Sequence, residues 1–360
     1  MSRVRPLVAG DLPQVAALHQ RLFAEGSRLS LAQRQRYLDQ VFLNNPWSDG
    51  DASPSLVCET TDGRLVGFLG VLRRPMSWNG QPIMAAVISQ FMVEPQHRGL
   101  TGFRLLATFL AGPQELSMTD GASHEAVKLW KAMGGVESPL HSLHWTRPLR
   151  PFAYGLAVLG PRLPGPTLVR PAAVAFDAVI ARLRRNPWRV APYGPDEELG
   201  ADAILEHERH CIPRGGLRPE YDRGSLKWLL EMAEQKGSPG PLRGALVRDA
   251  DHEVIGWYLY YVQRGVGSEV LQVAGRDQGL GEVLDHLFAD AWREGALAVS
   301  GRLQPQLLEA LRAKHCLFHD RGSPLIIYSR CRELISAIRS GEASLTRLDG
   351  EWWMPFQDVR

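Results

Sequence analysis

The sequence predicts a mixed α/β (α+β) protein built as two tandem domains. Each domain has a mixed central sheet flanked by helices. Three observations support this. The chain has 360 residues, more than one typical domain. Short segments of its first half recur in the same order in its second half. Each half also alternates apolar strand-like runs with amphipathic helical patterns. We therefore divide the chain into 1–150, a linker at 151–187, and 188–360 with a C-terminal extension.

Four short matches indicate the duplication. The paired segments are "SRVRPLVAGDL" and "WRVAPYGPDEEL", "DGRLVGF" and "DHEVIGW", "RGLTGFRLL" and "QGLGEVL", and "LWKAMGG" and "ALRAKHC". Arg3 matches Arg189 and Gly102 matches Gly281, so the halves are offset by roughly 180 residues. Four matches at a nearly constant offset are better evidence than any one of them alone.

The elements of the first half follow from local patterns. Residues 3–8 are expected to form a strand, and Asp11 then caps a helix that has Val15, Leu18 and Leu22 on one face. A second helix is expected over 31–43. "SLVCET" and "RLVGFLGV" form a hairpin turning at Asp62-Gly63. The expected remainder is the long strand "IMAAVISQFMV", a helix from Phe103, the strand "ELSMT", the helix "SHEAVKLWKAMG" and a closing strand "HSLHWTRP".

The second half repeats this order and is expected to close with the strand "PLIIYS". In both halves a glycine-containing loop follows the fourth strand. This order, β-α-α-β-β-β-α-β-α-β, resembles the GNAT superfamily of N-acyltransferases. The resemblance covers nearly the whole chain as two copies and is nearest to uncharacterised bacterial tandem members.

The loop "VEPQHRGLTG" predicts an anion site. Free N–H groups and the dipole at a helix start favour a phosphate, and glycine lets the backbone come close. The resemblance implies that this loop, with the signature Gln/Arg-x-x-Gly-x-Gly/Ala, holds the pyrophosphate of acetyl-CoA. The candidate donor-binding residues are Met92, Val93, Gln96, His97, Arg98, Gly99, Leu100, Thr101 and Gly102, with Arg276, Gly279 and Gly281 as their second-copy equivalents.

Neither loop is a clean match. Thr101 replaces the last glycine of the signature in the first copy. The second copy fits the signature but places Asp277 where a phosphate would sit. We favour the first copy because Arg98 adds positive charge there.

No catalytic residue is assigned from the sequence. The resemblance implies a tyrosine general acid on the fourth helix, but Trp130 stands at that position and an indole is no acid at neutral pH. Gln90, on the long strand, could position a water or the amine. Glu94 is a candidate base. Four histidines of the first half are further candidates: His97, His124, His141 and His144. Such residues are more commonly ordinary surface or core residues, and alternation in a strand would turn the last two to opposite faces.

The linker is basic and apolar. Between residues 138 and 195 there are eight arginines and one acid, Asp177. Phe176, Val179, Ile180 and Leu183 form a helical stripe that we expect to pack against the domains. A surface for an anionic partner (a membrane leaflet, a nucleic acid or a protein) is the alternative. The C-terminal "DGEWWMPF" is expected to dock on a domain or to line a pocket.

We expect a cytoplasmic acyl-CoA-dependent N-acyltransferase, with acetyl-CoA as the donor and a small-molecule or peptide amine as the acceptor. The net charge of +2 says nothing global about partners, and we do not expect a nucleic acid among them. The four dispersed cysteines favour neither a metal site nor a disulfide framework. No apolar run is long enough for a bilayer span. Two alternatives remain open: a Fem-like aminoacyl transferase, and a non-catalytic acyl-CoA-binding or interaction protein.

Overall fold

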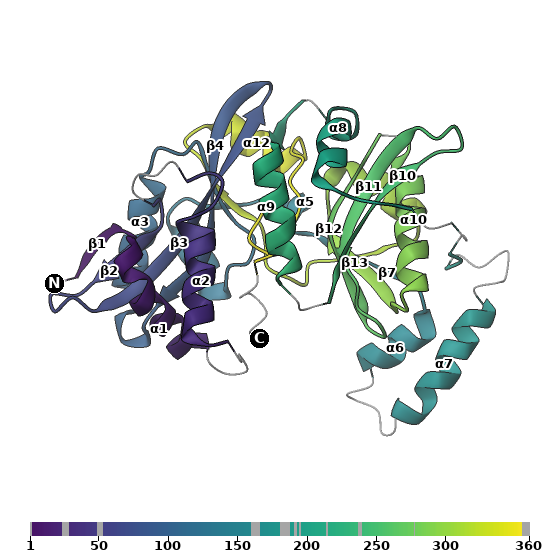
Figure 1. Cartoon of the computed structure of the whole chain (residues 1–360), viewed down its shortest axis with the longest axis horizontal. Coiled ribbons are helices and arrows are strands. Elements are labelled where there is room, and N and C mark those ends of the chain that lie inside the picture. The colour runs from purple at the N-terminus through teal and green to yellow at the C-terminus, as the bar shows by residue number, and fades with distance from the viewer. Residues whose placement is uncertain are drawn as a thin grey trace.

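The computed structural model describes residues 2–23, 29–48, 53–159, 166–180, 188–190, 193, 196–213, 215–236, 240–276 and 278–354. Two mixed sheets lie side by side, each flanked by helices (Figure 1). The expected fold class is therefore confirmed. The exact domain limits at 150 and 187 stay a prediction, because strands cross between the sheets as described below.

The first sheet has the strand order β1-β2-β3-β4-β5-β15-β6, and β9 pairs with β3. Its strands are Arg3–Pro6 (β1), Leu56–Glu59 (β2), Leu65–Trp78 (β3), Gln81–Val93 (β4), Leu116–Thr119 (β5), Val136–Glu137 (β6), Leu217–Pro219 (β9) and Ile326–Tyr328 (β15). Strand alternation divides the apolar residues of β3 between two faces. Phe68 and Leu72 join one core cluster, and Leu69 and Val71 join another.

Helices cover both faces of this sheet. The helices of the first half are Leu12–Phe23 (α1), Leu31–Phe42 (α2), Leu100–Leu110 (α3), His124–Ala132 (α4) and Pro139–Ser142 (α5). Apolar residues of α1 and α2 share the cluster of Phe68, whereas those of α3 and α4 share the cluster of Leu69. The short 3-10 turns Ala9–Asp11 (η1) and Pro95–His97 (η2) precede α1 and α3.

The second sheet has the order β14-β7-β13-β12-β11-β10-β8. Its strands are His144–Pro148 (β7), Glu197–Glu198 (β8), Leu242–Arg248 (β10), Val254–Tyr261 (β11), Gly267–Gly275 (β12), Ala298–Arg302 (β13) and Leu317–His319 (β14). The remaining helices are Pro151–Leu159 (α6), Pro166–Ile180 (α7), Ala201–Cys211 (α8), Arg223–Glu234 (α9), Leu280–Arg293 (α10), Leu308–Ala313 (α11) and Arg332–Ser340 (α12), with a 3-10 turn at Pro305–Leu307 (η4).

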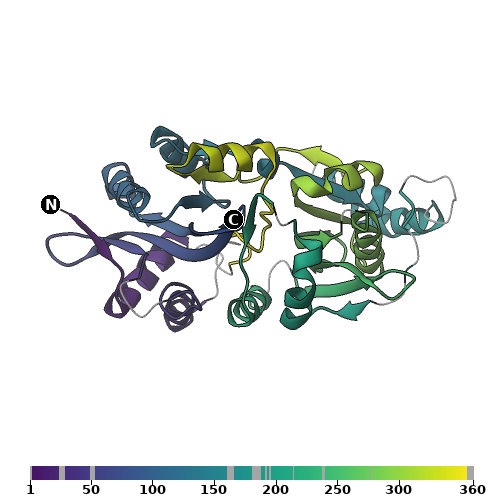
Figure 2. The same cartoon turned by 90° about the horizontal axis from the view of Figure 1, so that it is seen from above.

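The closing strands are exchanged between the halves. β7, from the first half, pairs with β13 and β14 in the second sheet. β15, from the second half, pairs with β5 and β6 in the first sheet. The expectation that each half closes its own sheet was wrong. Figure 2 accordingly shows α12 beside first-half elements, and α12 contacts α5.

The sheets also share one hydrophobic core. Its largest cluster runs from Leu72 on β3 through Leu229 on α9 to Trp257 on β11. The C-terminal segment (residues 343–354) enters the same cluster with the fully buried Trp353. This confirms that the described part of "DGEWWMPF", residues 349–354, docks on the body of the protein; the last two residues of the segment lie outside the described residues.

The first closing strand begins later than expected. It starts at His144, and residues 139–142 form the helical turn α5 after Pro139, a residue suited to a helix start. His141 therefore does not alternate with His144 along one strand, so that argument about their directions was wrong. His141 is buried, with Nδ1 3.0 Å from the Ser138 hydroxyl and Nε2 3.1 Å from the carbonyl oxygen of Ala343.

Candidate functional site

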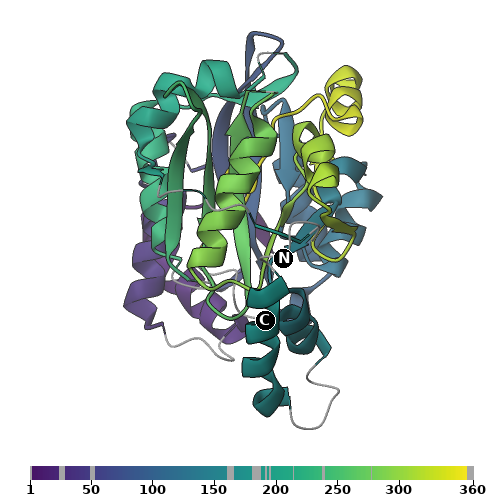
Figure 3. The same ribbon diagram turned by 90° about the vertical axis from the view of Figure 1, so that its right-hand side faces the viewer.

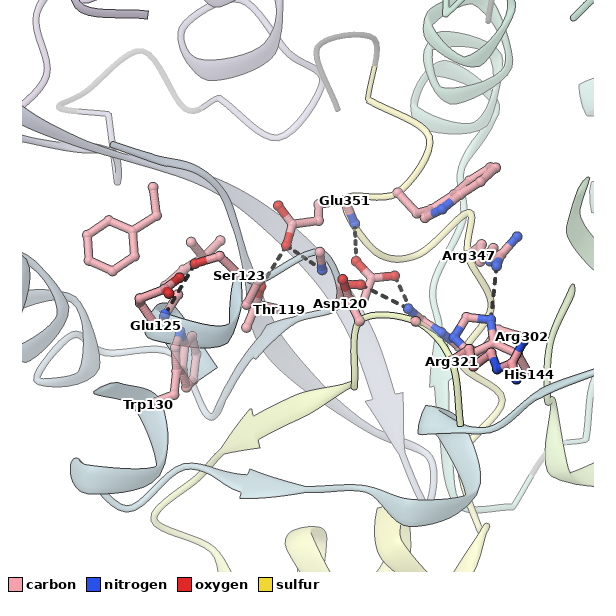
Figure 4. A pocket seen from close by; sticks show the side chains of 18 of the residues that line it. Thr119, Asp120, Ser123, Glu125, Trp130, His144, Arg302, Arg321, Arg347 and Glu351 are labelled. Carbon is pink, nitrogen blue, oxygen red and sulfur yellow. Dashed lines mark hydrogen bonds and ion pairs between the residues drawn. The ribbon is translucent and has the colours of Figure 1, made fainter. Parts of the chain in front are cut away.

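One large cavity, of ≈ 1530 Å³, is lined by residues of both sheets and of the C-terminal segment (Figure 4). One part of its wall comes from the ends of β4 and β5 and the starts of α3 and α4. Another part comes from β7, β13, β14 and the residues around Glu351, and residues at the end of α1 and on α6 also contribute. Such a volume suits a sizeable ligand, and ligand sites commonly lie between domains.

The cavity enters the first sheet where β4 and β5 part. The two strands pair in parallel only from Ala85 to Val87, opposite Leu116 to Met118. Beyond those pairs, Ile88 and residues 90–93 line one wall, and residues 119–123 line the other. We call these parted strand ends the first splay.

A β-bulge lies in the wall of the first splay. Phe68 pairs with Met92 and Gly70 with Ser89, so Gln90 and Phe91 together face one residue of β3. Gln90 takes a left-handed backbone conformation, with φ of +55°. A bulge re-aims side chains and leaves backbone groups outside the ladder. Strained backbone of this kind is often found at functional sites.

The glycine loop supplies free backbone amides at the start of α3. Gly99 caps the helix with φ of +90°, a conformation that favours glycine. Within the described chain, no backbone carbonyl accepts a hydrogen bond from the amides of residues 99–102. Amides at a helix start point outward along the helix axis, where they can bind an anion.

The structure divides the predicted donor-binding residues into two groups. Met92, Val93, Arg98, Gly99 and Gly102 line the cavity, whereas Gln96, His97, Leu100 and Thr101 do not. Thr101 is buried, and its methyl group packs against the α-carbon of Gly67. Thr101 thus serves helix–sheet packing, whereas the next residue, Gly102, lines the cavity.

Of the catalytic candidates Gln90, Trp130 and Glu94, the first two line the cavity and Glu94 does not. The Glu94 carboxylate lies 2.9 Å from Arg21 and 2.8 Å from Arg64, so its oxygens serve a structural ion-pair cluster. Trp130 lines the cavity but is fully buried and packs edge-on against Phe109.

Sequence reasoning missed the charged group at the end of β5. The Asp120 carboxylate lies 2.6 Å from the Arg302 guanidinium, and its second oxygen accepts a 2.7 Å hydrogen bond from the amide of Glu351. The Glu351 carboxylate accepts hydrogen bonds from the Thr119 hydroxyl (2.6 Å) and the Gly121 amide (2.8 Å). Figure 4 shows this cluster in the cavity wall. Its members are distant in sequence, so no local motif could have revealed it.

A neutral histidine lies beside this cluster. His144 Nδ1 is 3.1 Å from the Arg347 guanidinium, which is also 2.5 Å from Glu269. Burial, helped by the positive charges of Arg347 and Arg302, lowers the pKa of His144 to about 3. The ring stacks on His319 at 5.9 Å. His144 therefore accepts a hydrogen bond from Arg347 instead of carrying charge.

The equivalent strand ends in the second sheet, the second splay, are filled by the protein itself. β12 and β13 pair from Gly267 to Glu269 and then part. The Gln304 side-chain amide, oriented to satisfy both of its atoms, donates to the Val273 carbonyl (2.8 Å) and accepts from the Val273 amide (3.3 Å). The amide of Arg347 donates to the carbonyl of Leu271, the bulge residue of β12.

The second glycine loop satisfies two of its amides internally. The amides of Gly279 and Leu280 donate to the Arg276 carbonyl at 2.8 and 3.1 Å. Leu280 is 4% exposed, whereas its counterpart Leu100 is 70% exposed. Arg276, Gly279 and Gly281 do not line the cavity. Asp277 lies outside the described residues.

Comparison with known proteins supports the fold. No family model and no curated protein matches the sequence. A probable N-acyltransferase from Enterococcus faecalis, described as a conserved protein of unknown function, superposes with a TM-score of 0.57 at 10% identity, covering 91% of this chain and 72% of that one. A GCN5-related N-acetyltransferase from Kribbella flavida gives 0.56 at 16% identity, covering 95% and 73%. The chain has the GNAT fold.

The yeast N-myristoyltransferase, solved with bound myristoyl-CoA, is also similar, with a TM-score of 0.53 at 12% identity and coverage of 91% and 78%. The resemblance in element order read from the sequence is thus confirmed at the level of the GNAT fold. Among the described helices, none has the length and apolar character needed to cross a bilayer.

Proposed function

We propose that the protein is an acyl-CoA-dependent N-acyltransferase whose donor site is the first splay. The observation that carries this proposal is that one cavity joins the open strand pair, the Gln90 bulge and the start of α3 at Gly99 and Gly102, whose amides donate to no backbone carbonyl of the described chain. The same features in the second sheet are filled or satisfied internally. One donor site per chain follows.

The residues present suit a CoA thioester. Its pyrophosphate oxygens would accept hydrogen bonds from the backbone amides at the start of α3, and the Arg98 guanidinium would add positive charge. The acyl end would lie along β4, where a backbone N–H at the Gln90–Phe91 bulge supplies the hydrogen bond that stabilises a developing oxyanion. We take acetyl-CoA as the first donor to test.

The acceptor would reach the thioester through the part of the cavity shared by the two sheets. Its nitrogen attacks the thioester carbonyl, the new C–N bond forms, and the C–S bond breaks to release the thiolate of CoA. We assign Glu351 to take the proton from the amine, because its carboxylate lines the cavity at the end of β5. Trp130 leaves no protein acid at the tyrosine position, so the thiolate departs unaided and is protonated by solvent.

Calorimetric titration with acetyl-CoA tests the donor site. We expect one site per chain, lost in Arg98→Glu and kept in the matched variant Arg276→Glu, because only Arg98 lines the cavity. Two sites would show that the second loop is competent. No binding of acetyl-CoA or of a long-chain acyl-CoA at millimolar concentration would overturn the proposal.

Release of free thiol with a panel of amines then separates an enzyme from a binding protein. Glu351→Gln should lower kcat while leaving the acetyl-CoA affinity nearly unchanged, since the side chain acts on the amine. CoA binding without turnover on any amine would favour the non-catalytic alternative, which the absence of a tyrosine acid supports.

A further inference from the structure

The α6–α7 hairpin presents its large apolar side chains to solvent. Phe152, Val158, Phe176 and Val179 are 48–60% exposed. Phe152 and Phe176 contact each other edge-on at 4.6 Å, so they form one patch. Figures 1 and 3 show the hairpin projecting from the body beyond the end of the second sheet. Contiguous exposed apolar side chains generally mark an interaction surface.

The opposite face of the hairpin holds it to the body. Ala173 is buried with Ala153 and Leu297 in a small cluster. Asp177, one turn after Ala173, is buried and accepts hydrogen bonds from the amides of Phe152 (3.1 Å) and Ala153 (2.9 Å). Ala173 and Asp177 of α7 thus face inward, whereas Phe176 and Val179 face outward. The expectation that the stripe with Phe176 and Val179 packs against the domains was therefore wrong; Leu183 lies outside the described residues, and nothing is described of the Ile180 side chain.

The charged residues of this region are almost all positive. Asp177 is the only acid between residues 138 and 195, and capping α6 uses it. Two of the eight arginines are engaged with the body: Arg147 lies over Trp188, and Arg150 lies over Trp292. The sequence beside and within the hairpin adds Arg162, Arg170, Arg182, Arg184, Arg185 and Arg189 with no further acid.

We propose that the exposed apolar face of α6–α7 docks on an anionic lipid bilayer. An apolar patch in a segment with eight arginines and one acid is the combination that binds the interface of such a bilayer: the aromatic and aliphatic side chains enter the headgroup region, and the net positive charge of the segment attracts anionic lipids. A nucleic acid would match the arginines but would not cover Phe152, Phe176 and Val179.

Docking there would place the rim of the cavity at the membrane. Tyr154 and Val158 of α6 line the cavity together with Leu317 and Phe318 of β14, and the last three are also exposed. A lipid amine could then enter the cavity directly from the bilayer. This consequence rests on the proposed acyltransferase function, whereas the docking itself does not.

Vesicle flotation with the full chain tests the docking. We expect binding to phosphatidylcholine vesicles containing phosphatidylglycerol, and much weaker binding to phosphatidylcholine alone. The double variant Phe176→Ser/Val179→Ser should lose about tenfold in vesicle affinity, because two of the inserting side chains become polar. The matched control is Leu31→Ser/Val266→Ser, which changes exposed apolar residues on other elements.

Equal melting temperatures and unchanged acetyl-CoA titration show that both double variants keep the fold and donor site. No flotation with anionic vesicles, or equal flotation of the two variants, would overturn the proposal. So would light scattering that shows a wild-type dimer converted to a monomer by Phe176→Ser/Val179→Ser, since the patch would then be an interface between copies of this chain. Failure of acetyl-CoA binding with intact flotation would overturn the proposed function alone.

Discussion

The two splays have the same topology and different contents. In each, an antiparallel strand pair carries a bulge, a parallel strand parts after three pairs, and a glycine loop starts a helix. In the first splay these features line a cavity. In the second splay, Gln304, Arg347 and the Arg276 carbonyl take the hydrogen bonds that a ligand would make.

The difference shows how a binding site can close while its fold persists. A splay leaves backbone donors and acceptors without strand partners, and buried backbone groups must be paired. A ligand can supply the partners, or a side-chain amide can. The Gln304 side-chain amide pairs with the backbone N–H and C=O of Val273, as a residue of a neighbouring strand would. A few side chains are therefore enough to fill a splay, and the sheet topology stays the same.

The largest expected effect comes from placing a negative charge at the start of α3, with the start of α10 as the comparison. Gly102→Glu should weaken acetyl-CoA binding about 100-fold, or roughly 2.7 kcal/mol, because a carboxylate would occupy the anion site. An added Cβ at Gly102 meets no atom closer than 3.7 Å, and one at Gly281 meets none within 4 Å, so both variants should fold. Gly281→Glu is the control, and titration calorimetry is the measurement. Similar weakening in both variants would contradict the comparison.

Removing the Gln304 side chain, which fills the second splay, should lower the stability of the fold without creating a second acetyl-CoA site. Gln304→Ala leaves the amide and carbonyl of Val273 unpaired, which we expect to lower the free energy of unfolding by about 2 kcal/mol. Urea unfolding measures this, and calorimetry should still show one acetyl-CoA per chain. A second bound equivalent in the variant would mean that Gln304 alone closes the second splay.

Acid should destabilise the protein through histidines of the first half. Burial lowers the pKa of His19 and His141 to about 4 and that of His144 to about 3. Because these rings take up protons more readily in the unfolded chain, their stabilising contribution is present above about pH 6.5 and falls as pH drops toward 4. Each contributes a slope of about 1.4 kcal/mol per pH unit in that range.

Urea unfolding at pH 7.5 and 5.5 checks this slope. His144→Gln should make it shallower, since an amide oxygen can still accept from Arg347 and does not titrate in this range. An unchanged slope in that variant would show that His144 is protonated in the folded protein at pH 5.5.

The smallest effect is expected at the first bulge. Gln90→Gly should change the free energy of unfolding by less than about 1 kcal/mol, because glycine accepts a positive φ. Gln90→Val should destabilise more, since a β-branched residue resists that conformation. Thermal melts compare the two. Equal melts would mean that the bulge relaxes when Gln90 is replaced.

The fold was predictable because repeat and periodicity are local signals. The matched segments around Gly102 and Gly281 and the strand–loop–helix order lie within short windows. The partner of a strand is not local: β7 and β15 are both short, largely buried strands, so their patterns suit either sheet. Their exchange could not be read from the sequence.

The site was predictable to the same extent. The loop signature led to Arg98, Gly99 and Gly102, which do line the cavity, and their role in binding stays a prediction. Asp120, Arg302 and Glu351 meet only after both sheets and the C-terminal segment are in place. The roles of Glu94 and Thr101 depend on neighbours distant in sequence, Arg21 and Gly67 among them.

The exchanged strands also bear on synthesis of the protein. The edge of β5 is completed by residues 326–328, about 200 positions after β5 itself. At roughly 5–20 residues per second, a ribosome needs about 10–40 s to make that stretch. During this time the nascent first sheet has an unpaired apolar edge, which is a site for aggregation. Residues 326–328 therefore decide whether the first sheet is finished, and translation that terminates before Ile326 yields a product that cannot close it.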